Sequence, residues 1–447
     1  MTYRLARITG MLALGLVLYL PLEPAILSVL PLEFYWFLRL APDALIVLVA
    51  AGLVLSELRS PSLQARLLIL LAAIGLGFTF LDAARGFAVV DTVNALRVVL
   101  RYVVLGLTLW RAAPFIPRFP DQFLSAVFVA GMVQIAAGIA EIVIRVADPS
   151  LLGLNGLWFV EGTTGRYDRF GFSMVAFVIV VLVRVRYRID RSSLLVGAAG
   201  SVGTFLLVLT ASRQAMLALA IAALALATAR LPWLRRLAFV AVSAALVVMI
   251  SLVPSTIRIS QNGPDPAGTV SGGPDDPDRG GSGSGTVIIT AEKGSSELTV
   301  NPNRNFRLYL NAVLMPWAAF QEPVLGFGPY EQTNLHADSR LRNAVVSAGM
   351  DWAYATTFTN DSNYASLVIQ FGLFLPVLFV LMLGYLTFSA LRRSRTPGAP
   401  LIQQFALVLA AAFLVAALFG PAFEQRISSS LLWIALFTAF AYRAEEA

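Results

Sequence analysis

Residues 122–145 read QFLSAVFVAGMVQIAAGIAEIVIR, an almost unbroken apolar run with a single carboxylate, Glu141. A helix of this length crosses the ~30 Å of hydrocarbon in a bilayer, which takes about 20 apolar residues. Similar runs recur along the chain, which is 58% apolar and only 13% charged. Water-soluble proteins need more charge on their surface. The sequence therefore predicts an all-α polytopic membrane protein.

The apolar runs predict about twelve transmembrane helices. The expected spans are 8–30, 42–57, 67–84, 93–110, 122–145, 170–187, 193–211, 213–229, 236–253, 363–391, 402–420 and 428–442. About nine of them belong to a bundle within residues 1–253, and about three belong to a second group within residues 363–447. The two groups are joined by a single large connection, residues 254–362.

The arginines between the spans predict the orientation of the chain. One alternate set of connections is strongly basic, as in residues 184–191 and 392–395, whereas the other set is mixed in sign. The positive-inside rule places the basic set, and with it both termini, in the cytoplasm. The large connection 254–362 is then extracytoplasmic, that is, periplasmic or extracellular.

The large connection has two parts of different composition. Residues 260–300 are rich in Gly, Pro, Ser and Asp, which cannot bury enough apolar surface to offset the entropy of ordering, so we expect this part to be flexible. Residues 304–321 combine an apolar face with a second face that carries Arg304 and Arg307, which predicts an amphipathic helix at the outer membrane interface. The apolar face consists of Phe306, Leu310, Val313, Trp317 and Phe320.

Arginine occurs at three places close to the membrane, where it needs a cavity or a partner. These are Arg166 with Arg169 before a short span, Arg213 in a tight turn between two spans, and the Arg304 and Arg307 face. Guanidinium groups that converge from separate segments suit a di-anion such as pyrophosphate, which they bind bidentately. The alternative is that each arginine pairs with a nearby carboxylate: Arg169 with Asp168 or Glu161, Arg213 with Glu424, and Arg307 with Glu322.

Two residues of the large connection are candidates for a general base. Asp361 precedes the span that begins at residue 363. A role as the N-cap of that helix explains an aspartate at this position as well as a role as the base does. His336 is the only histidine, and solvated surface is the more common environment of such a residue. No cluster has metal-ligand spacing and there is no cysteine, so we expect neither a metal nor another cofactor. The net charge of +7 is nearly all arginine, and we do not take it to indicate nucleic-acid binding.

Several short motifs together resemble the O-antigen ligase and O-antigen polymerase superfamily of bacterial membrane glycosyltransferases. They are Arg169-Phe170-Gly171-Phe172, Leu209–Ala215, Arg307–Trp317 followed by Glu322–Gly328, and Asp361-Ser362-Asn363-Tyr364 with Phe371-Gly372-Leu373. The resemblance covers roughly residues 165–385. The ligases of the family carry histidine just before the asparagine, where this chain has Ser362, and in this respect the chain is more similar to the polymerases.

The resemblance implies a GT-C-like helical bundle that transfers glycan, without a metal, from an undecaprenyl-pyrophosphate carrier to an acceptor hydroxyl at the outer face of the inner membrane. Arg166, Arg169, Arg213 and Arg304 would bind the pyrophosphate. Catalysis would fall to Arg307 together with Asp361 or His336 as the base. The implied partners are the lipid-linked glycan, an acceptor glycan or lipid, the bilayer and other polysaccharide assembly proteins such as a chain-length regulator.

Three functions remain open from the sequence. A polymerase of repeat units is preferred because of Ser362, and a ligase onto lipid A core or a protein acceptor is the alternative within the same class. A secondary transporter is the alternative from another class. It would place ionisable residues near the membrane midplane and often shows an inverted repeat. Glu141 is the best mid-span acidic candidate, and no repeat is visible.

Overall fold

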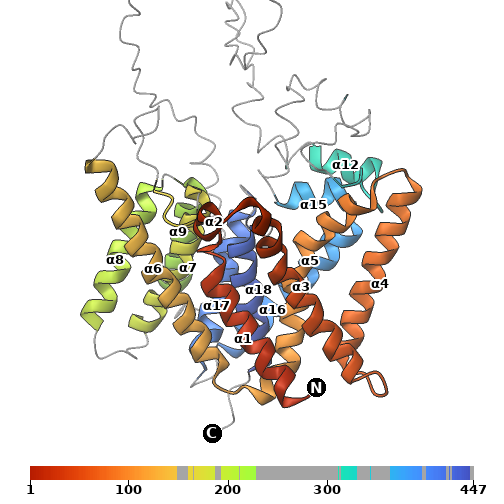
Figure 1. Cartoon of the computed structure of the whole chain (residues 1–447), viewed down its shortest axis with the longest axis horizontal. Helices are drawn as coiled ribbons and strands as arrows, with labels where there is room; N and C mark the ends of the chain where they lie inside the picture. Colours follow the sequence, from red (N-terminus) through yellow and green to blue (C-terminus); the bar gives the residue numbers. More distant parts are fainter. Residues whose placement is uncertain are drawn as a thin grey trace, which may run out of the picture.

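The computed structural model describes residues 1–147, 160–164, 166–186, 193–210, 212–227, 311, 314–329, 343, 363–394, 399–418, 422 and 425–442. All regular secondary structure in these ranges is helical, and the helices pack into a bundle (Figure 1). Five of the described helices are long and apolar enough to cross a membrane, or six if one bent pair is a single span. The prediction of an all-α polytopic membrane protein is confirmed.

The described helices largely follow the predicted spans. In chain order they are α1 (Tyr3–Tyr19), α2 (Glu23–Val29), α3 (Leu32–Ser56), α4 (Leu63–Ala84), α5 (Val89–Ala112), the 3-10 turn η1 (Ala113–Phe115), α6 (Phe119–Ala147), α7 (Tyr167–Arg186), α8 (Ser193–Leu209), α9 (Arg213–Ala227), α12 (Met315–Gln321), α15 (Asn363–Phe371), α16 (Phe374–Arg393), α17 (Leu401–Ala416) and α18 (Arg426–Ala441). The predicted span 236–253 and the flexible part 260–300 lie outside the described residues. The number of twelve spans therefore stays a prediction.

Two predicted spans are broken in the structure. The span 8–30 consists of α1 and α2, which meet at an angle of 71°. Pro21 lies in this bend, and proline cannot donate the backbone hydrogen bond that would continue a helix. The span 363–391 is divided into α15 and α16 at Gly372, whose φ of 65° is a left-handed conformation that favours glycine.

The two ends of the bundle are marked by contacts between distant parts of the chain. At one end, the amino group of Met1 lies 2.9 Å from Glu57, and the hydroxyl of Tyr442 donates to the carbonyl of Ile116. We call this end the terminus side. The opposite end, here the cavity side, carries α2, α12 and the first turns of α7, α15 and α18 (Figure 1). Successive helices cross between the two sides in the predicted alternation.

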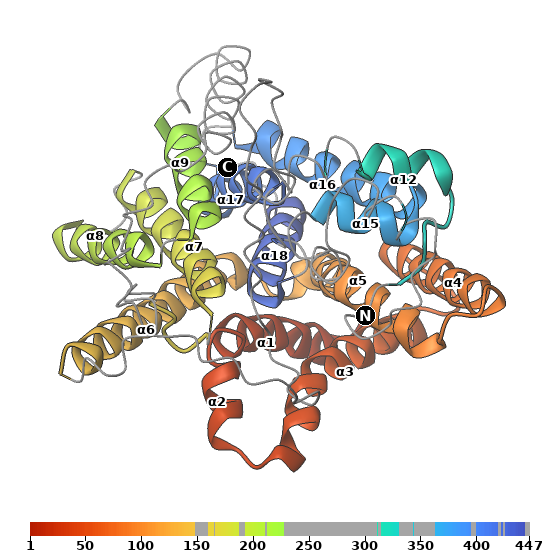
Figure 2. The ribbon, with the colours of Figure 1, turned by 90° about the horizontal axis from the view of Figure 1, so that it is seen from above.

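The centre of the bundle is α18, which packs against α5, α17, α16 and α7 (Figure 2). Nearly every residue of α18 is buried, and Gly106 of α5 leaves room for the ring of Phe437. The peripheral helices α4 and α8 instead expose large apolar side chains such as Phe80 and Phe205, as lipid-facing helices do. Helices α17 and α18 bury polar residues such as Gln403 and Ser428, and α4 buries Asp82, which accepts a hydrogen bond from the hydroxyl of Thr92.

The described part of the predicted amphipathic helix 304–321 contains the short helix α12. Helix α12 begins at Met315 with Pro316 in its first turn, and it buries Leu314 and Ala318. Phe320, a member of the predicted apolar face, is 84% exposed, as a side chain that faces lipid would be. Helix α12 packs against α15 and against the turn that follows α12. The indole of Trp317 in α12 stacks on the ring of Phe327 in that turn, with 5.3 Å between the ring centroids.

Candidate functional site

The cavity side contains a cavity of about 550 Å³ between α1, α2, α3, α5, α7 and α18. This volume is typical of small-molecule sites, which measure about 300–1,000 Å³. Among the described residues its charged lining is strongly cationic, with six arginines and two carboxylates. They are Arg39, Arg97, Arg101, Arg166, Arg169 and Arg426 with Glu23 and Asp43. Such a charge balance favours an anionic ligand.

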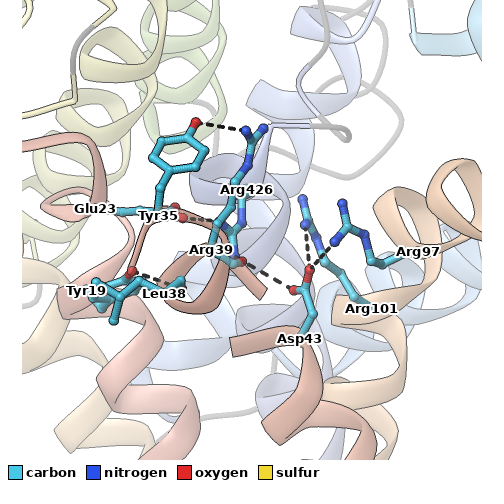
Figure 3. Close-up of polar contacts among 9 residues, drawn as sticks. All are labelled: Tyr19, Glu23, Tyr35, Leu38, Arg39, Asp43, Arg97, Arg101 and Arg426. Atoms are coloured by element: carbon cyan, nitrogen blue, oxygen red, sulfur yellow. Dashed lines mark hydrogen bonds and ion pairs between the residues drawn. The ribbon is translucent and has the colours of Figure 1, made fainter. Parts of the chain in front are cut away.

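Asp43 of α3 is at the centre of the arginine group (Figure 3). Its Oδ2 accepts a hydrogen bond from Nη1 of Arg101 at 3.3 Å and lies 3.4 Å from Nη1 of Arg97. Its Oδ1 lies 3.8 Å from Nη2 of Arg426 and accepts no hydrogen bond in the described part of the chain. Asp43 is only 7% exposed, so a single buried carboxylate faces three guanidinium groups.

Arg426 ties three helices together at the cavity. It is the first residue of α18 and forms an ion pair with Glu23, the first residue of α2. It also donates to the main-chain carbonyl of Arg39 in α3 at 3.0 Å. The side chain of Arg39 in turn donates to the hydroxyl of Tyr35 at 2.9 Å. The bend between α1 and α2 therefore brings Glu23 next to Arg426, which it would not reach if the two helices were continuous.

Arg166 pairs with Asp168, the carboxylate that the pairing alternative gave to Arg169. Its Nε and Nη2 each lie 3.1 Å from one carboxylate oxygen of Asp168, and its side chain is 54% exposed. Asp168 also accepts a hydrogen bond of 2.7 Å from the amide of Gln425. The carboxylate nearest to the start of α7 is therefore already occupied by two donors.

Arg169 is different, although it lies only one turn further along α7. It is half-buried and lines the cavity, and it forms no hydrogen bond or ion pair with any residue that the structure describes. The predicted alternative, an ion pair with Asp168 or Glu161, is not observed. Among the predicted arginines whose side chains the structure describes, Arg169 is the one that lines the cavity and has no ion-pair partner among the described residues.

The turn that precedes Arg213 packs directly against the start of α7. A Cβ atom on Gly171 would lie 2.7 Å from Cβ of Ala215 and 3.3 Å from Cβ of Ser212. The absence of a side chain at Gly171 therefore allows the two backbones to approach. The segments of Arg169 and Arg213 are brought together as the motifs suggest, while the side chain of Arg213 and all of Arg304, Arg307, His336 and Asp361 lie outside the described residues.

The two glycine motifs of the sequence interlock. The amide of Phe327 donates to the carbonyl of Ile369 at 2.7 Å, and the amide of Leu373 donates to Pro323 at 2.7 Å. Gly326 has a φ of 67°, and a Cβ atom on it would lie 2.4 Å from the amide nitrogen of Gly372. These glycines hold the end of the large connection against α15, so their role in the structure is architectural.

Glu141, the mid-span carboxylate of the transporter alternative, also has an architectural role. Its Oε2 accepts hydrogen bonds from the backbone amides of Glu161 and Gly162 at 3.0 and 2.8 Å. Its Oε1 pairs with Arg145 at 2.5 Å. Glu141 is not among the residues that line the cavity, and it fixes the segment that leads into α7.

Sequence reasoning missed most of the cavity. A usable signal was present, because Arg97 and Arg101 stand four residues apart inside the predicted span 93–110, where charge is costly and indicates a partner or a cavity. Arg39 and Arg426 were not singled out, because each lies in a connection that also carries an acidic residue. The cavity residues absent from the prediction are Glu23, Arg39, Asp43, Arg97, Arg101 and Arg426.

Residues 197–380 match the family model described as O-antigen ligase (Wzy_C). This region therefore resembles an O-antigen ligase domain. The match begins in α8, ends in α16 and includes the Arg213 turn and both glycine motifs, so the resemblance to the O-antigen ligase and polymerase superfamily is confirmed. It supports membrane glycosyltransferase activity of the ligase or polymerase type. No curated protein matches the chain.

The region that matches the O-antigen ligase model and the described lining of the cavity come from different parts of the chain. The described residues that line the cavity come from positions 20–101, 166–169 and 425–427, outside the matched region 197–380. Contact between the two is made where α7 packs on α8 and α9. The matched region thus adjoins a cationic cavity whose described lining comes from other helices.

Proposed function

We propose that the protein transfers glycan from an undecaprenyl-pyrophosphate carrier to an acceptor sugar hydroxyl at the outer face of the bacterial inner membrane. The observation that carries this proposal is the position of Arg169. Its guanidinium faces a cationic cavity without a carboxylate partner among the described residues, and its helix packs on the turn before Arg213 of the O-antigen ligase domain.

Arginine suits the departure of a lipid pyrophosphate. When the bond between the sugar C1 and the pyrophosphate oxygen breaks, negative charge develops on the leaving oxygen. Guanidinium groups fixed in advance around that position stabilise this charge, and such preorganised stabilisation is often the largest single contribution to catalysis. Arg166, Arg169, Arg213 and Arg304 are assigned to pyrophosphate binding, and the positive charge that they supply requires no metal ion.

The acceptor hydroxyl must lose its proton as it attacks C1. Asp361 and His336 are the two candidates for this base, and Arg307 is assigned to the reacting end of the same site. Asp361 stands two residues before Asn363, whose backbone N–H donates to the carbonyl of Ala417 at 3.0 Å. The start of α15 is therefore anchored on α17, and the nearness of Asp361 in the sequence to this anchor is the support for Asp361 as the base.

The orientation follows from the arginine distribution. Both termini are assigned to the cytoplasm by the positive-inside rule, which places the cavity side and the connection 254–362 outside. A carrier lipid would then reach the cavity side laterally from the outer leaflet, with the amphipathic segment 304–321 over the site. The described crossing pattern, with Tyr3 and Ala441 on the same side, supports this arrangement.

Within this class we propose a polymerase of polysaccharide repeat units. The support is Ser362, which stands where the ligases of the family carry histidine. Ligation onto lipid A core or a protein acceptor is the second candidate, and chain-length regulators or other assembly proteins are the proposed partners of a polymerase. The transporter alternative loses its main support because Glu141 is held by backbone amides and Arg145 away from the cavity lining.

The test is reconstitution of the full chain in lipid nanodiscs with undecaprenyl-pyrophosphate-linked repeat units. A polymerase gives a ladder of products on a gel, whereas a ligase gives one product only when lipid A core or a protein acceptor is added. Arg169→Ala should remove the product in either case, and Arg66→Gln, an exposed change on the terminus side, should not. Absence of any transfer by the folded wild-type chain with all three acceptors would overturn the proposal.

A further inference from the structure

The cavity holds more positive charge than a pyrophosphate accounts for. Arg166 is neutralised by Asp168, which leaves five other arginines in the described lining against Glu23 and Asp43. The proposed function also assigns Arg213 and Arg304 to the pyrophosphate, and their side chains lie outside the described residues. A pyrophosphate that lies near Arg169 therefore does not neutralise the group around Asp43.

Three guanidinium groups in this part of the cavity have unsatisfied donors. The Nε atoms of Arg97, Arg101 and Arg426 are buried and have no hydrogen-bond acceptor in the described part of the chain. Oδ1 of Asp43 likewise accepts no hydrogen bond there. Buried donors are nearly always paired in folded proteins, so these three Nε–H donors beside the cavity are available to an acceptor that a ligand supplies.

The cavity also has room for a second group. At about 30 Å³ per non-hydrogen atom, the share of a water molecule in the liquid, a pyrophosphate would fill at most about half of the cavity. The cavity measures about 550 Å³. The remaining space is comparable to one sugar ring. Its walls include apolar side chains such as Leu20, Leu27 and Val98, against which the faces of a sugar ring can pack.

The location of these arginines suggests that they distinguish substrates. None of them falls within residues 197–380, which carry the O-antigen ligase domain. Arg97 and Arg101 come from α5 and Arg426 from α18, so they are features that the rest of this chain adds beside the matched region. A guanidinium group recognises a carboxylate or phosphate bidentately and offers nothing equivalent to a neutral hydroxyl.

We propose that Arg97, Arg101 and Arg426 around Asp43 form a subsite for the acidic group of an anionic sugar, and that the glycan substrate is therefore an acidic saccharide. This inference rests on the proposed function, because it names the substrate class of the same site. Asp43 is the positioning residue of the subsite. It holds the three guanidinium groups together in the absence of substrate, and it competes with the acidic group of the sugar for them.

The test measures binding of free saccharides to the purified full chain, with no lipid-linked donor present. The probes are a glucuronic-acid-containing disaccharide, a sugar phosphate, a neutral disaccharide of the same size and inorganic pyrophosphate, all at one ionic strength. The acidic probes should bind at least about tenfold more tightly than the neutral disaccharide. The carboxylate and phosphate probes distinguish which acidic group fits better. Equal binding of acidic and neutral disaccharides by wild type would overturn the proposal without any variant.

Two variants should change the affinity in opposite directions. Arg97→Gln, at a side chain that is 30% exposed, should weaken binding of the acidic disaccharide about tenfold because a guanidinium is lost. Asp43→Asn should lower the thermal stability of the free protein yet tighten binding of the acidic disaccharide, because the competing carboxylate is lost. Arg66→Gln is the control, at an exposed arginine that donates to a backbone carbonyl outside the cavity.

The outcomes separate this inference from the proposed function. If both variants weaken binding alike, Asp43 is merely structural and the competing-carboxylate role is wrong. If pyrophosphate binds, transfer occurs and the acidic disaccharide binds no better than the neutral one, the subsite is wrong while the proposed function stands. If the acidic disaccharide binds selectively but no lipid-linked glycan is transferred, the subsite stands and the proposed function fails.

Discussion

Arginine has opposite roles at the two ends of this bundle. On the terminus side, Nε of Arg111 lies 2.8 Å from a carboxylate oxygen of Glu57, and Arg393 donates to the carbonyl of Ala439 at the end of α18. The protein itself supplies an acceptor for each of these two. On the cavity side, three guanidinium groups share Asp43, and Arg169 has no ion-pair partner among the described residues.

Whether the protein itself supplies an acceptor distinguishes arginines that anchor the fold from arginines that bind a ligand. A charge held near low-dielectric surroundings without a partner costs several kcal/mol, so a protein keeps such a charge only where a ligand compensates it. Arginines whose acceptors are internal stabilise the fold, whereas arginines that outnumber their acceptors around a cavity are available to an anion.

The largest effect is expected at Arg169. Arg169→Ala should reduce glycan transfer about 10²–10³-fold, the cost of removing one preorganised donor from a developing anion, or about 3–4 kcal/mol. Arg169→Lys should rescue poorly because the bidentate geometry is lost. The matched change on the terminus side, Arg111→Ala, should lower thermal stability and leave the turnover of the folded fraction near that of wild type. Turnover per folded protein, measured with lipid-linked donor, checks both, and equal losses in the two variants would erase the contrast.

The next largest effect is expected at Gly326, in the glycine turns that hold the large connection against α15. Gly326→Ala adds a Cβ atom 2.4 Å from the amide nitrogen of Gly372 at a φ of 67°, so it should destabilise the chain by about 2–3 kcal/mol. Gly384 of α16 has nothing within 4 Å of an added Cβ, and Gly384→Ala should be neutral or stabilising by up to about 1 kcal/mol. Thermal unfolding in one detergent compares the pair. A harmless Gly326→Ala would mean that the interlocked glycine turns do not hold the large connection in place.

On the terminus side, Glu57 should control stability and its dependence on pH. Burial raises the pKa of Glu57, but hydrogen bonds from Ser62 and the amino group of Met1, together with Arg111, outweigh it and lower the pKa from 4.5 to about 2. A carboxyl whose pKa is lowered on folding stabilises the protein above pH 4.5, and this contribution is lost as the pH falls toward 2. Glu57→Gln should therefore cost about 2 kcal/mol at pH 7.

The pH profile provides the control for that variant. The difference in unfolding temperature between wild type and Glu57→Gln should be constant from pH 7 to about pH 5 and should shrink below it. A difference that does not change between pH 7 and pH 3.5 would show that the ionised carboxylate is not what stabilises the terminus side.

The fold class was accessible from the sequence because one physical constraint dominates it. Backbone polar groups in a bilayer must be paired within the segment, so long apolar runs such as 122–145 become helices whatever their neighbours are. The breaks were less accessible. Gly372 reads as one more small residue in an apolar run, and its left-handed conformation follows from a contact with Gly326, forty-six residues away, which no local pattern encodes.

The candidate site was accessible only in part. Arg169 was found because it borders a short span, but Arg101 was passed over although it lies deeper in a span than Arg169. The partner of Arg101 is Asp43, fifty-eight residues earlier, and their meeting depends on how α3 packs on α5. Periodicity shows that a charge within a span needs a partner. It does not show which of the many carboxylates supplies that partner, nor that one carboxylate is shared among three arginines.

The smallest effect is expected at Arg166, and it tests the contrast within a single helical turn. Arg166 is three residues from Arg169, yet its guanidinium is already bound by both oxygens of Asp168 and is largely exposed. Exposed ion pairs contribute about 0–1 kcal/mol, so Arg166→Ala should leave stability unchanged within that range. Its effect on transfer should not exceed about tenfold, since a guanidinium that is shared with a carboxylate has less to offer a pyrophosphate. Asp168→Asn should then increase the contribution of Arg166, so that Arg166→Ala costs more transfer activity in that background than in wild type. If Arg166→Ala abolishes transfer in the wild-type background as Arg169→Ala does, internal pairing does not separate anchoring from binding arginines in this protein.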